Sequence, residues 1–173
     1  MRKPFPAASL LATSLIAFFA SAPLTAQPNS PDPKCMEGVY TLEEFKRDGE
    51  VFRPPQASGR WVVLNGTVVW IFNDRTQASK QTNFAGVGRY AISETAYSYQ
   101  YDEIEVFTQT DTGITVSRKL PWEGMRPYTP VQEADGVHLQ NAESRTDFVC
   151  SAEGLTYTFG SGSYRKYRRM KSD

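Results

Sequence analysis

Residues 59–72 constrain the fold of this chain most strongly, because an Asn-Gly pair separates two apolar, β-rich runs there. Asn65 and Gly66 tolerate the positive φ that a two-residue hairpin turn requires. A turn at these residues places Trp61 opposite Trp70, since the loop length fixes the register. Side chains alternate across each strand, so one face carries Trp61, Val63, Val68, Trp70 and Phe72. The opposite face is also largely apolar, which favours the wall of a closed sheet over an edge ribbon.

The N-terminal 26 residues have the pattern of a cleaved secretory signal peptide. Arg2 and Lys3 precede an apolar run over residues 10–20, and small residues follow up to a predicted cleavage site after Ala26. A membrane anchor is the alternative, but the run is shorter than the roughly 20 residues that span a bilayer. Residues 27–35 are expected to be a flexible leader, and residues 36–170 a single domain. No later segment has the length and hydropathy of a membrane span, and export to the periplasm or the medium is expected.

The net charge and the number of cysteines indicate which partner and which covalent link to expect. The whole chain carries 19 basic and 19 acidic side chains, and residues 1–26 hold two of the basic ones, so the exported part has a net charge of −2. This balance gives no reason to expect nucleic acid as a partner. Cys35 and Cys150 are the two cysteines, and an even pair in an exported chain predicts one disulfide. Two free thiols are the alternative.

Short β-rich runs recur along the domain and are separated by turn residues such as Asp48-Gly49 and Asp135-Gly136. Many short strands at regular spacing predict an all-β fold, specifically a single antiparallel up-and-down β-barrel of about 8–10 strands. In the run 96–107 the apolar parity changes midway, which predicts a β-bulge near Asp102. A loop over residues 121–130 either covers one mouth of the barrel or packs on its outside. Strands are expected near 38–46, 59–64, 67–73, 84–92, 96–107, 113–119, 136–140, 145–150, 154–160 and 163–169.

Few residues offer catalytic or metal chemistry. His138 is the one histidine; it is either a general base beside a carboxylate or an ordinary satisfied side chain. With one histidine and two bridged cysteines, no transition-metal site of the usual ligand type is expected. No nucleophile motif is present, and neither a catalytic residue nor a cofactor is predicted. The acids Asp102, Glu103 and Glu105 either supply a catalytic carboxylate pair or form a solvated strand face.

The basic segment 164–171 allows two interpretations. Its basic and aromatic residues alternate, with Tyr164, Lys166 and Arg168 facing one way and Arg165, Tyr167 and Arg169 the other. Such a segment can bind nucleic acid or anionic lipid. The structural interpretation, which we favour, is a terminal strand whose charges discourage edge pairing.

Aromatic residues exceed what a core of this size needs. Inside a barrel they either fill the interior or line a cavity for one small ligand. The candidate ligand-binding residues are Trp61, Trp70, Tyr90 and Tyr99, with Arg89 as the polar anchor.

Gly38-Val39-Tyr40, residues 84–90 and Tyr167-Arg168-Arg169 together resemble motifs of the bacterial lipocalin-like families within the calycin barrels. Gly38-Val39-Tyr40 is similar to their opening Gly-x-Trp strand, with tyrosine in place of tryptophan, and residues 84–90 are similar to the glycine-tyrosine strand that follows. Tyr167-Arg168-Arg169 resembles the closing strand, whose arginine packs on the opening aromatic residue. The resemblance implies that Tyr40 pairs with Arg168 or Arg169. It also implies binding of a small hydrophobic molecule.

Three functions are therefore expected in decreasing order. The first is an exported barrel that binds a small hydrophobic or aromatic ligand. The second is an enzyme on the same barrel, of isomerase, hydratase or decarboxylase type, using acid–base chemistry of a pair such as Tyr99 and Glu103. The third is a structural or interaction module of the envelope without a ligand. Neither the ligand nor the oligomeric state follows from the sequence.

Overall fold

The computed structural model describes residues 31–160 and 162–171, so the predicted signal peptide lies outside the described residues. Ten antiparallel strands form a closed barrel in the order β1-β3-β4-β5-β6-β8-β9-β10-β11-β12, and β12 pairs with β1 to close it. The predicted all-β barrel is confirmed. The barrel strands are β1 (Gly38–Arg47), β3 (Ala57–Leu64), β4 (Thr67–Gln77), β5 (Lys80–Ser93), β6 (Ala96–Thr110), β8 (Arg126–Glu133), β9 (Gly136–Asn141), β10 (Thr146–Cys150), β11 (Gly154–Phe159) and β12 (Ser163–Arg169).

Three further elements lie off this closed path. The short 3₁₀ helix η1 (Pro33–Met36) precedes the barrel. Strand β2 (Glu50–Phe52) folds back on the end of β1, and β7 (Gly113–Ser117) pairs with the outer part of β6.

The hairpin of β3 and β4 has the register predicted for residues 59–72. Trp61 pairs with Trp70 and Leu64 with Thr67, and the turn residues Asn65 and Gly66 have φ values of 52° and 77°. The face that carries Trp61 points into the barrel, because Trp61, Val63 and Val68 are at most 1% exposed.

Strand β6 contains the predicted bulge. Val87 pairs with Glu103 but Gly88 pairs with Tyr101, so Asp102 is the extra residue. The bulge keeps both halves of the strand apolar on the inside, with Tyr101 before it and Ile104 after it buried. As a consequence Glu103 points outward.

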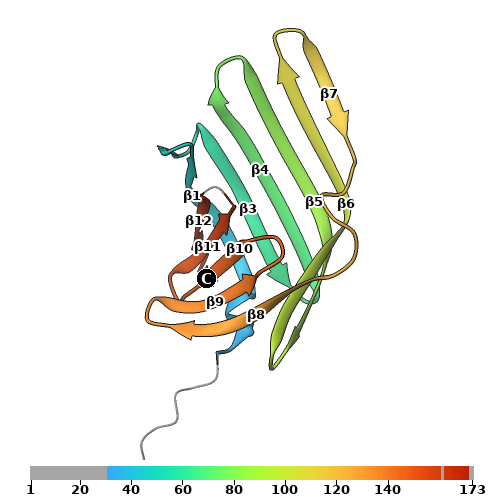
Figure 1. Cartoon of the computed structure of the whole chain (residues 1–173). Coiled ribbons are helices and arrows are strands. Elements are labelled where there is room, and N and C mark those ends of the chain that lie inside the picture. Colours follow the sequence, from blue (N-terminus) through green and yellow to red (C-terminus); the bar gives the residue numbers. More distant parts are fainter. Residues whose placement is uncertain (1–30, 161, 172–173) are drawn as a thin grey trace, which may run out of the picture.

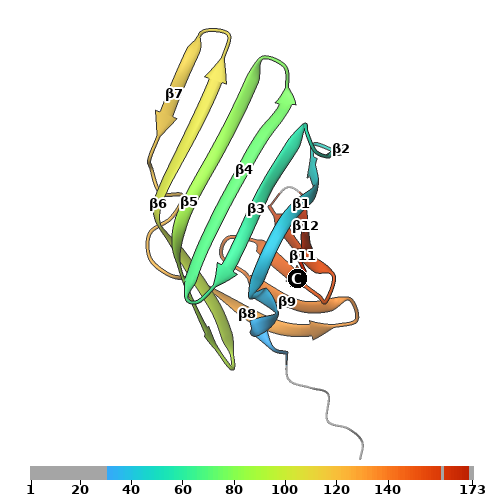
Figure 2. The ribbon, with the colours of Figure 1, turned by 180° about the vertical axis from the view of Figure 1, so that it is seen from behind.

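The barrel has walls of unequal height. Strands β5 and β6 contain 14 and 15 residues, whereas β9, β10 and β11 contain 5 or 6. Figures 1 and 2 show the long strands β4, β5 and β6, with the short β7 paired to the end of β6, projecting well beyond the short strands on the opposite wall. One end of the barrel is therefore open toward the tall wall.

The other end is closed by η1. The Tyr40 hydroxyl donates to the carbonyls of Cys35 and Met36, and the Arg169 guanidinium lies 4.9 Å from the Tyr40 ring. Arg169 also donates to the carbonyl of Cys35, at 2.6 Å. This is the aromatic–arginine closure that the resemblance implied, with Arg169 rather than Arg168 in the role. The predicted disulfide, Cys35–Cys150, ties η1 to β10.

Two strands were missed from the sequence, the short β2 and the longer β8. Residues 126–133 form β8, although Pro127 and Pro130 had indicated a loop. Strand β8 pairs with β6 over Arg126–Tyr128 and with β9 over Thr129–Glu133, so most of its length has a hydrogen-bonded neighbour on one side only. A proline is tolerated in such a strand, because its missing N–H can face the unpaired side.

Candidate ligand-binding site

The middle of the barrel is filled by side chains. Trp61 is 1% exposed, and its ring lies between 5.3 and 6.1 Å from five other aromatic rings. At this level the aromatic excess therefore forms a packed core. The five rings are those of Trp70, Tyr99, Phe148, Tyr157 and Tyr167.

The other predicted ligand-binding residues lie at different depths. Tyr99 is 1% exposed and belongs to the same core as Trp61. Tyr90 lies at the closed end, where its hydroxyl donates to the Glu37 carboxylate. Trp70 is only partly buried, and its indole N–H donates to the Tyr167 hydroxyl at 2.9 Å. The predicted residues thus do not form one site, and only Trp70 reaches the open end.

Arg89 does not point into the barrel, so its prediction as the polar anchor is wrong. Its side chain is 65% exposed and lies 3.5 Å from the Asp102 carboxylate on the outer face. The reason is the strand period, because Gly88 and Tyr90 on either side of it point inward.

Arg165 is the interior arginine. Its guanidinium carbon lies 4.4 to 5.3 Å from the centroids of four aromatic rings. We call Arg165 and these rings the arginine–aromatic cluster. The four rings are those of Phe45, Trp70, Phe72 and Phe159.

The register of β12 positions this cluster. Arg165 pairs with Phe45 on β1 and with Tyr157 on β11, four residues along the strand from Arg169 at the closed end. At about 3.3 Å per residue this separation is about 13 Å along the strand, toward the open end. Arg165, Trp70 and Phe159 are all partly exposed, in contrast to the fully buried residues around Tyr40. The cluster therefore lies beyond the fully buried core, toward the open end.

The charge of Arg165 has no acidic partner. Within residues 31–160 and 162–171, no carboxylate forms an ion pair with it, and its buried Nε has no hydrogen-bond partner. The aromatic faces compensate only part of the cost of burying the guanidinium.

The nearby tyrosines remain neutral at physiological pH. Burial raises the pKa of both Tyr157 and Tyr167 to about 12, although the positive charge of Arg165 acts in the opposite direction. No ionised tyrosine therefore offsets the positive charge of Arg165.

The loop before β8 contributes to the interior. The Trp122 ring lies 5.2 Å from that of Tyr99 and 5.3 Å from that of Tyr101, and the Arg126 guanidinium covers it at 3.8 Å. Trp122 therefore packs on inward-facing tyrosines and not on the outside of the sheet, whereas coverage of a barrel mouth by this loop stays a prediction.

A groove of about 620 Å³ lies on the outside of β4–β6, away from the cluster. Its lining includes Ile71, Val87 and Arg118, and Arg118 donates to the Glu105 carboxylate at 2.6 Å. Arg118 therefore has the ionic partner that Arg165 lacks.

The pair required for the predicted acid–base enzyme does not form. Tyr99 is buried in the core, whereas Glu103 is exposed on the outer face beyond the bulge. These two residues cannot act on one substrate.

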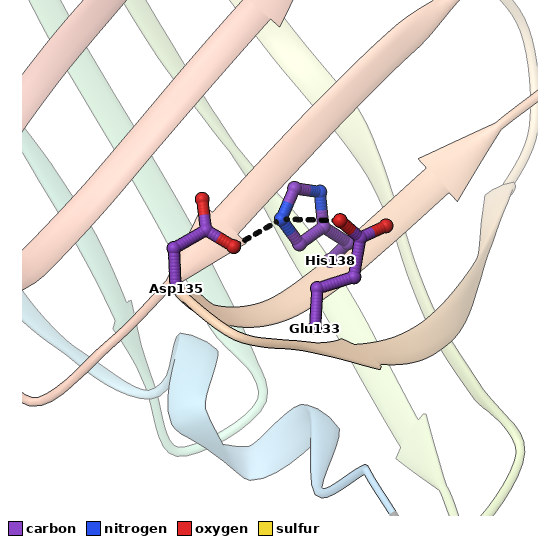
Figure 3. A group of neighbouring side chains, drawn as sticks. All are labelled: Glu133, Asp135 and His138. Carbon is purple, nitrogen blue, oxygen red and sulfur yellow. Dashed lines mark hydrogen bonds and ion pairs between the residues drawn. The ribbon is translucent and has the colours of Figure 1, made fainter.

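His138 also lies on the outside, at the β8–β9 turn. Its Nδ1 is 2.9 Å from an Asp147 oxygen, and its Nε2 is 2.9 Å from an Asp135 oxygen and 3.6 Å from a Glu133 oxygen. Figure 3 shows Glu133 and Asp135 converging on the same ring nitrogen. Counting histidine and cysteine alone had missed this mixed set of ligand types. The signal was present as Glu133-x-Asp135-x-x-His138 across a hairpin turn.

The pKa values in this group follow burial and pairing. Burial lowers the pKa of the His138 imidazole, but hydrogen bonds to Asp135 and Asp147 outweigh burial and the net shift is upward. The pKa of Asp135 is lowered by its hydrogen bond to His138. The pKa of Asp147 is raised, because burial outweighs the same kind of bond.

Comparison with protein-family models, curated proteins and solved structures finds no match to this chain. The search for a transmembrane helix among the described residues also finds none.

Proposed function

We propose that this protein is an exported β-barrel that binds a small amphipathic anion, with an apolar or aromatic body, at the open end of the barrel. The observation that carries the proposal is Arg165, a partly buried guanidinium among aromatic rings that has no acidic partner in the described part of the chain. A carboxylate, sulfate or phosphate group of a ligand would supply that partner. A planar guanidinium can bind such a group with two parallel hydrogen bonds.

The surroundings of Arg165 suit the apolar body of such a ligand. Several partly buried aromatic rings, two of them in the cluster, pack against the core, and flat apolar surfaces of a ligand stack on such rings. These rings belong to Phe52, Trp70, Phe84, Trp122, Tyr157 and Phe159.

Export is supported by two independent features. The first is the signal-peptide pattern of residues 1–26, and the second is the Cys35–Cys150 disulfide, which is typical of oxidising compartments. Binding a diffusible small molecule in the periplasm or the medium is consistent with both.

Native mass spectrometry of the protein purified from its native source tests the proposal. We expect an added mass that denaturation releases as an organic acid, and we expect the Arg165→Met variant to lose it. Arg118→Met is the matched control, because it removes the same charge from the outer groove and should retain the ligand. A ligand-free protein that also fails to bind apolar acids added in vitro contradicts the proposal.

The second candidate is the interaction module, and the outer face of the tall wall favours it. Five apolar side chains there are between 40% and 66% exposed, which is unusual on a surface that meets only water. Sedimentation of the wild type and of Val116→Lys would detect an assembly that uses this face. The exposed residues are Ile71, Val87, Phe107, Ile114 and Val116.

A further inference from the structure

We propose that Glu133, Asp135 and His138 bind a divalent transition-metal ion, with Zn²⁺ as the ion to test, on the outside of the barrel. This site is separate from the arginine–aromatic cluster and does not depend on the proposed ligand. Its three ligand atoms come from both sides of the β8–β9 turn and lie within 4.8 Å of one another.

The hairpin brings these side chains together. Glu133 pairs with Gly136 and Val131 pairs with His138, so Glu133 and His138 are diagonal neighbours on one face of the two strands. Asp135 occupies the turn between them and reaches the same ring nitrogen, as Figure 3 shows. One imidazole nitrogen and two carboxylates are ordinary Zn²⁺ ligands, and water can occupy the fourth position.

Asp147 adds an observation from a different strand. Its carboxylate, on β10, lies 2.9 Å from Nδ1 of His138, on the opposite side of the ring from Asp135. A neutral imidazole has one N–H. If Asp147 accepts that N–H, the Nε2 lone pair faces two carboxylates, and this arrangement is repulsive unless a cation lies between them. A carboxylate behind a histidine is also the usual outer partner of a metal-bound imidazole.

The local charge is also unbalanced. Three carboxylates surround His138, and no lysine or arginine in the described part of the chain forms an ion pair with any of them. A cation at this point would offset that charge, either a metal ion between the three ligands or a proton on Nε2.

Calorimetric titration of the metal-free, disulfide-bonded protein with Zn²⁺ at neutral pH separates these two occupants. We expect one ion per chain. His138→Gln, Glu133→Gln and Asp135→Asn should each weaken binding by tenfold or more. Asp147→Asn, which acts through the orientation of His138, should weaken it by about 10- to 100-fold.

Glu143→Gln is the matched control, because Glu143 is an exposed acid in the neighbouring β9–β10 turn. It should bind Zn²⁺ like the wild type, and near-ultraviolet circular dichroism should show that every variant is folded. Absence of stoichiometric binding, or equal affinity of His138→Gln and Glu143→Gln, overturns the proposal.

Nitrogen NMR of the His138 ring gives a second readout in the unmodified protein. Coordination predicts that Zn²⁺ displaces the Nε2 resonance while Nδ1 keeps its proton toward Asp147. A spectrum in which Zn²⁺ leaves Nε2 unchanged shows that a proton is the only occupant and overturns the proposal.

Discussion

At the scale of single residues, Trp61 is the largest fully buried side chain of the described core. Its ring is almost fully buried among five other aromatic rings, and its indole nitrogen has no hydrogen-bond partner. Removing the ring leaves a large cavity in a region that cannot collapse easily, because strands from both walls hold it.

We therefore predict that Trp61→Ala lowers the free energy of unfolding by about 3–5 kcal/mol. Trp61→Phe should cost less, because it keeps part of the packing and removes the unpaired N–H. Urea unfolding measures both, with Arg60→Ala on the exposed side of the same strand as the control. Equal stability of Trp61→Ala and the wild type would contradict a filled core.

The buried tyrosines predict a specific alkaline transition. Burial raises the pKa of Tyr40, Tyr157 and Tyr167 to about 12, whereas tyrosine in an unfolded chain has a pKa of about 10. Between these values the unfolded state loses protons that the folded state keeps, so stability is complete below pH 10 and falls as the pH rises toward 12.

Stability measured by urea unfolding across this pH range, together with tyrosinate absorbance, checks the prediction. Tyr157→Phe should make the loss of stability less steep, because one shifted group is gone. Ionisation of every tyrosine near pH 10 without any loss of stability would contradict the prediction.

The inward direction of the Arg165 side chain could not be predicted from the sequence. The alternation of Arg165, Tyr167 and Arg169 on one side of the last strand was predicted and agrees with the structure. Which side faces inward was not, since aromatic and basic residues occur on both. Arg89 was predicted to anchor a ligand together with Tyr90, but neighbouring residues in a strand point to opposite faces.

At the scale of elements, the bulge of β6 depends on a glycine opposite it. A Cβ at Gly88 would lie 1.9 Å from the Gln100 carbonyl oxygen and 2.7 Å from the Tyr101 Cα. Both are backbone atoms of β6, so the contact cannot be relieved by a rotamer change.

Gly88→Ala is expected to push β5 and β6 apart beside the bulge and to lower the urea midpoint of unfolding. Amide hydrogen exchange should be faster around Gly88 and Tyr101 in the variant. Gly160→Ala is the control, because no atom lies within 4 Å of a Cβ there. Unchanged exchange in Gly88→Ala would show that the close approach of the strands is not required.

The Cys35–Cys150 disulfide holds η1, the element that closes one end of the barrel. Cys35 and Cys150 are separated by 115 residues, so the bridge strongly restricts the unfolded chain. Replacing both cysteines by alanine should lower the free energy of unfolding by about 2–5 kcal/mol, measured in urea. The wild type under reducing conditions should lose a similar amount. A loss below the error of the measurement would mean that η1 is held by the contacts of Tyr40 and Arg169 alone.

Short sequence patterns predicted those structural features that depend on residues close together in the chain. Asn65-Gly66 fixed the register of β3 and β4, and the change of parity around Asp102 located the bulge. Strand β8 was missed because Pro127 and Pro130 normally interrupt a sheet, and its tolerance for proline depends on neighbours far away in the sequence. The Glu133–His138 group was missed for the related reason that only the paired hairpin brings its ligands together.

At the scale of the whole molecule, the barrel combines a sealed end and an open end. Helix η1, the disulfide and Arg169 close one end, while the partly exposed Arg165 and its aromatic neighbours lie toward the other end, where the walls have unequal heights (Figure 1). Because the middle between these ends is filled, the ligand-binding site that we propose lies at the open end. This asymmetry distinguishes the proposed binding mode from a central cavity.

The most direct test of this account is a comparison of two fluorescent probes that differ only in an acidic group, titrated into wild type, Arg165→Met and Arg118→Met. We predict that the acidic naphthalene probe binds the wild type and Arg118→Met equally, and binds Arg165→Met about tenfold or more weakly, since a charge-assisted contact contributes about 1.5–3 kcal/mol. The neutral probe should not distinguish the three proteins. Equal binding of the acidic probe to the wild type and Arg165→Met would contradict the central claim.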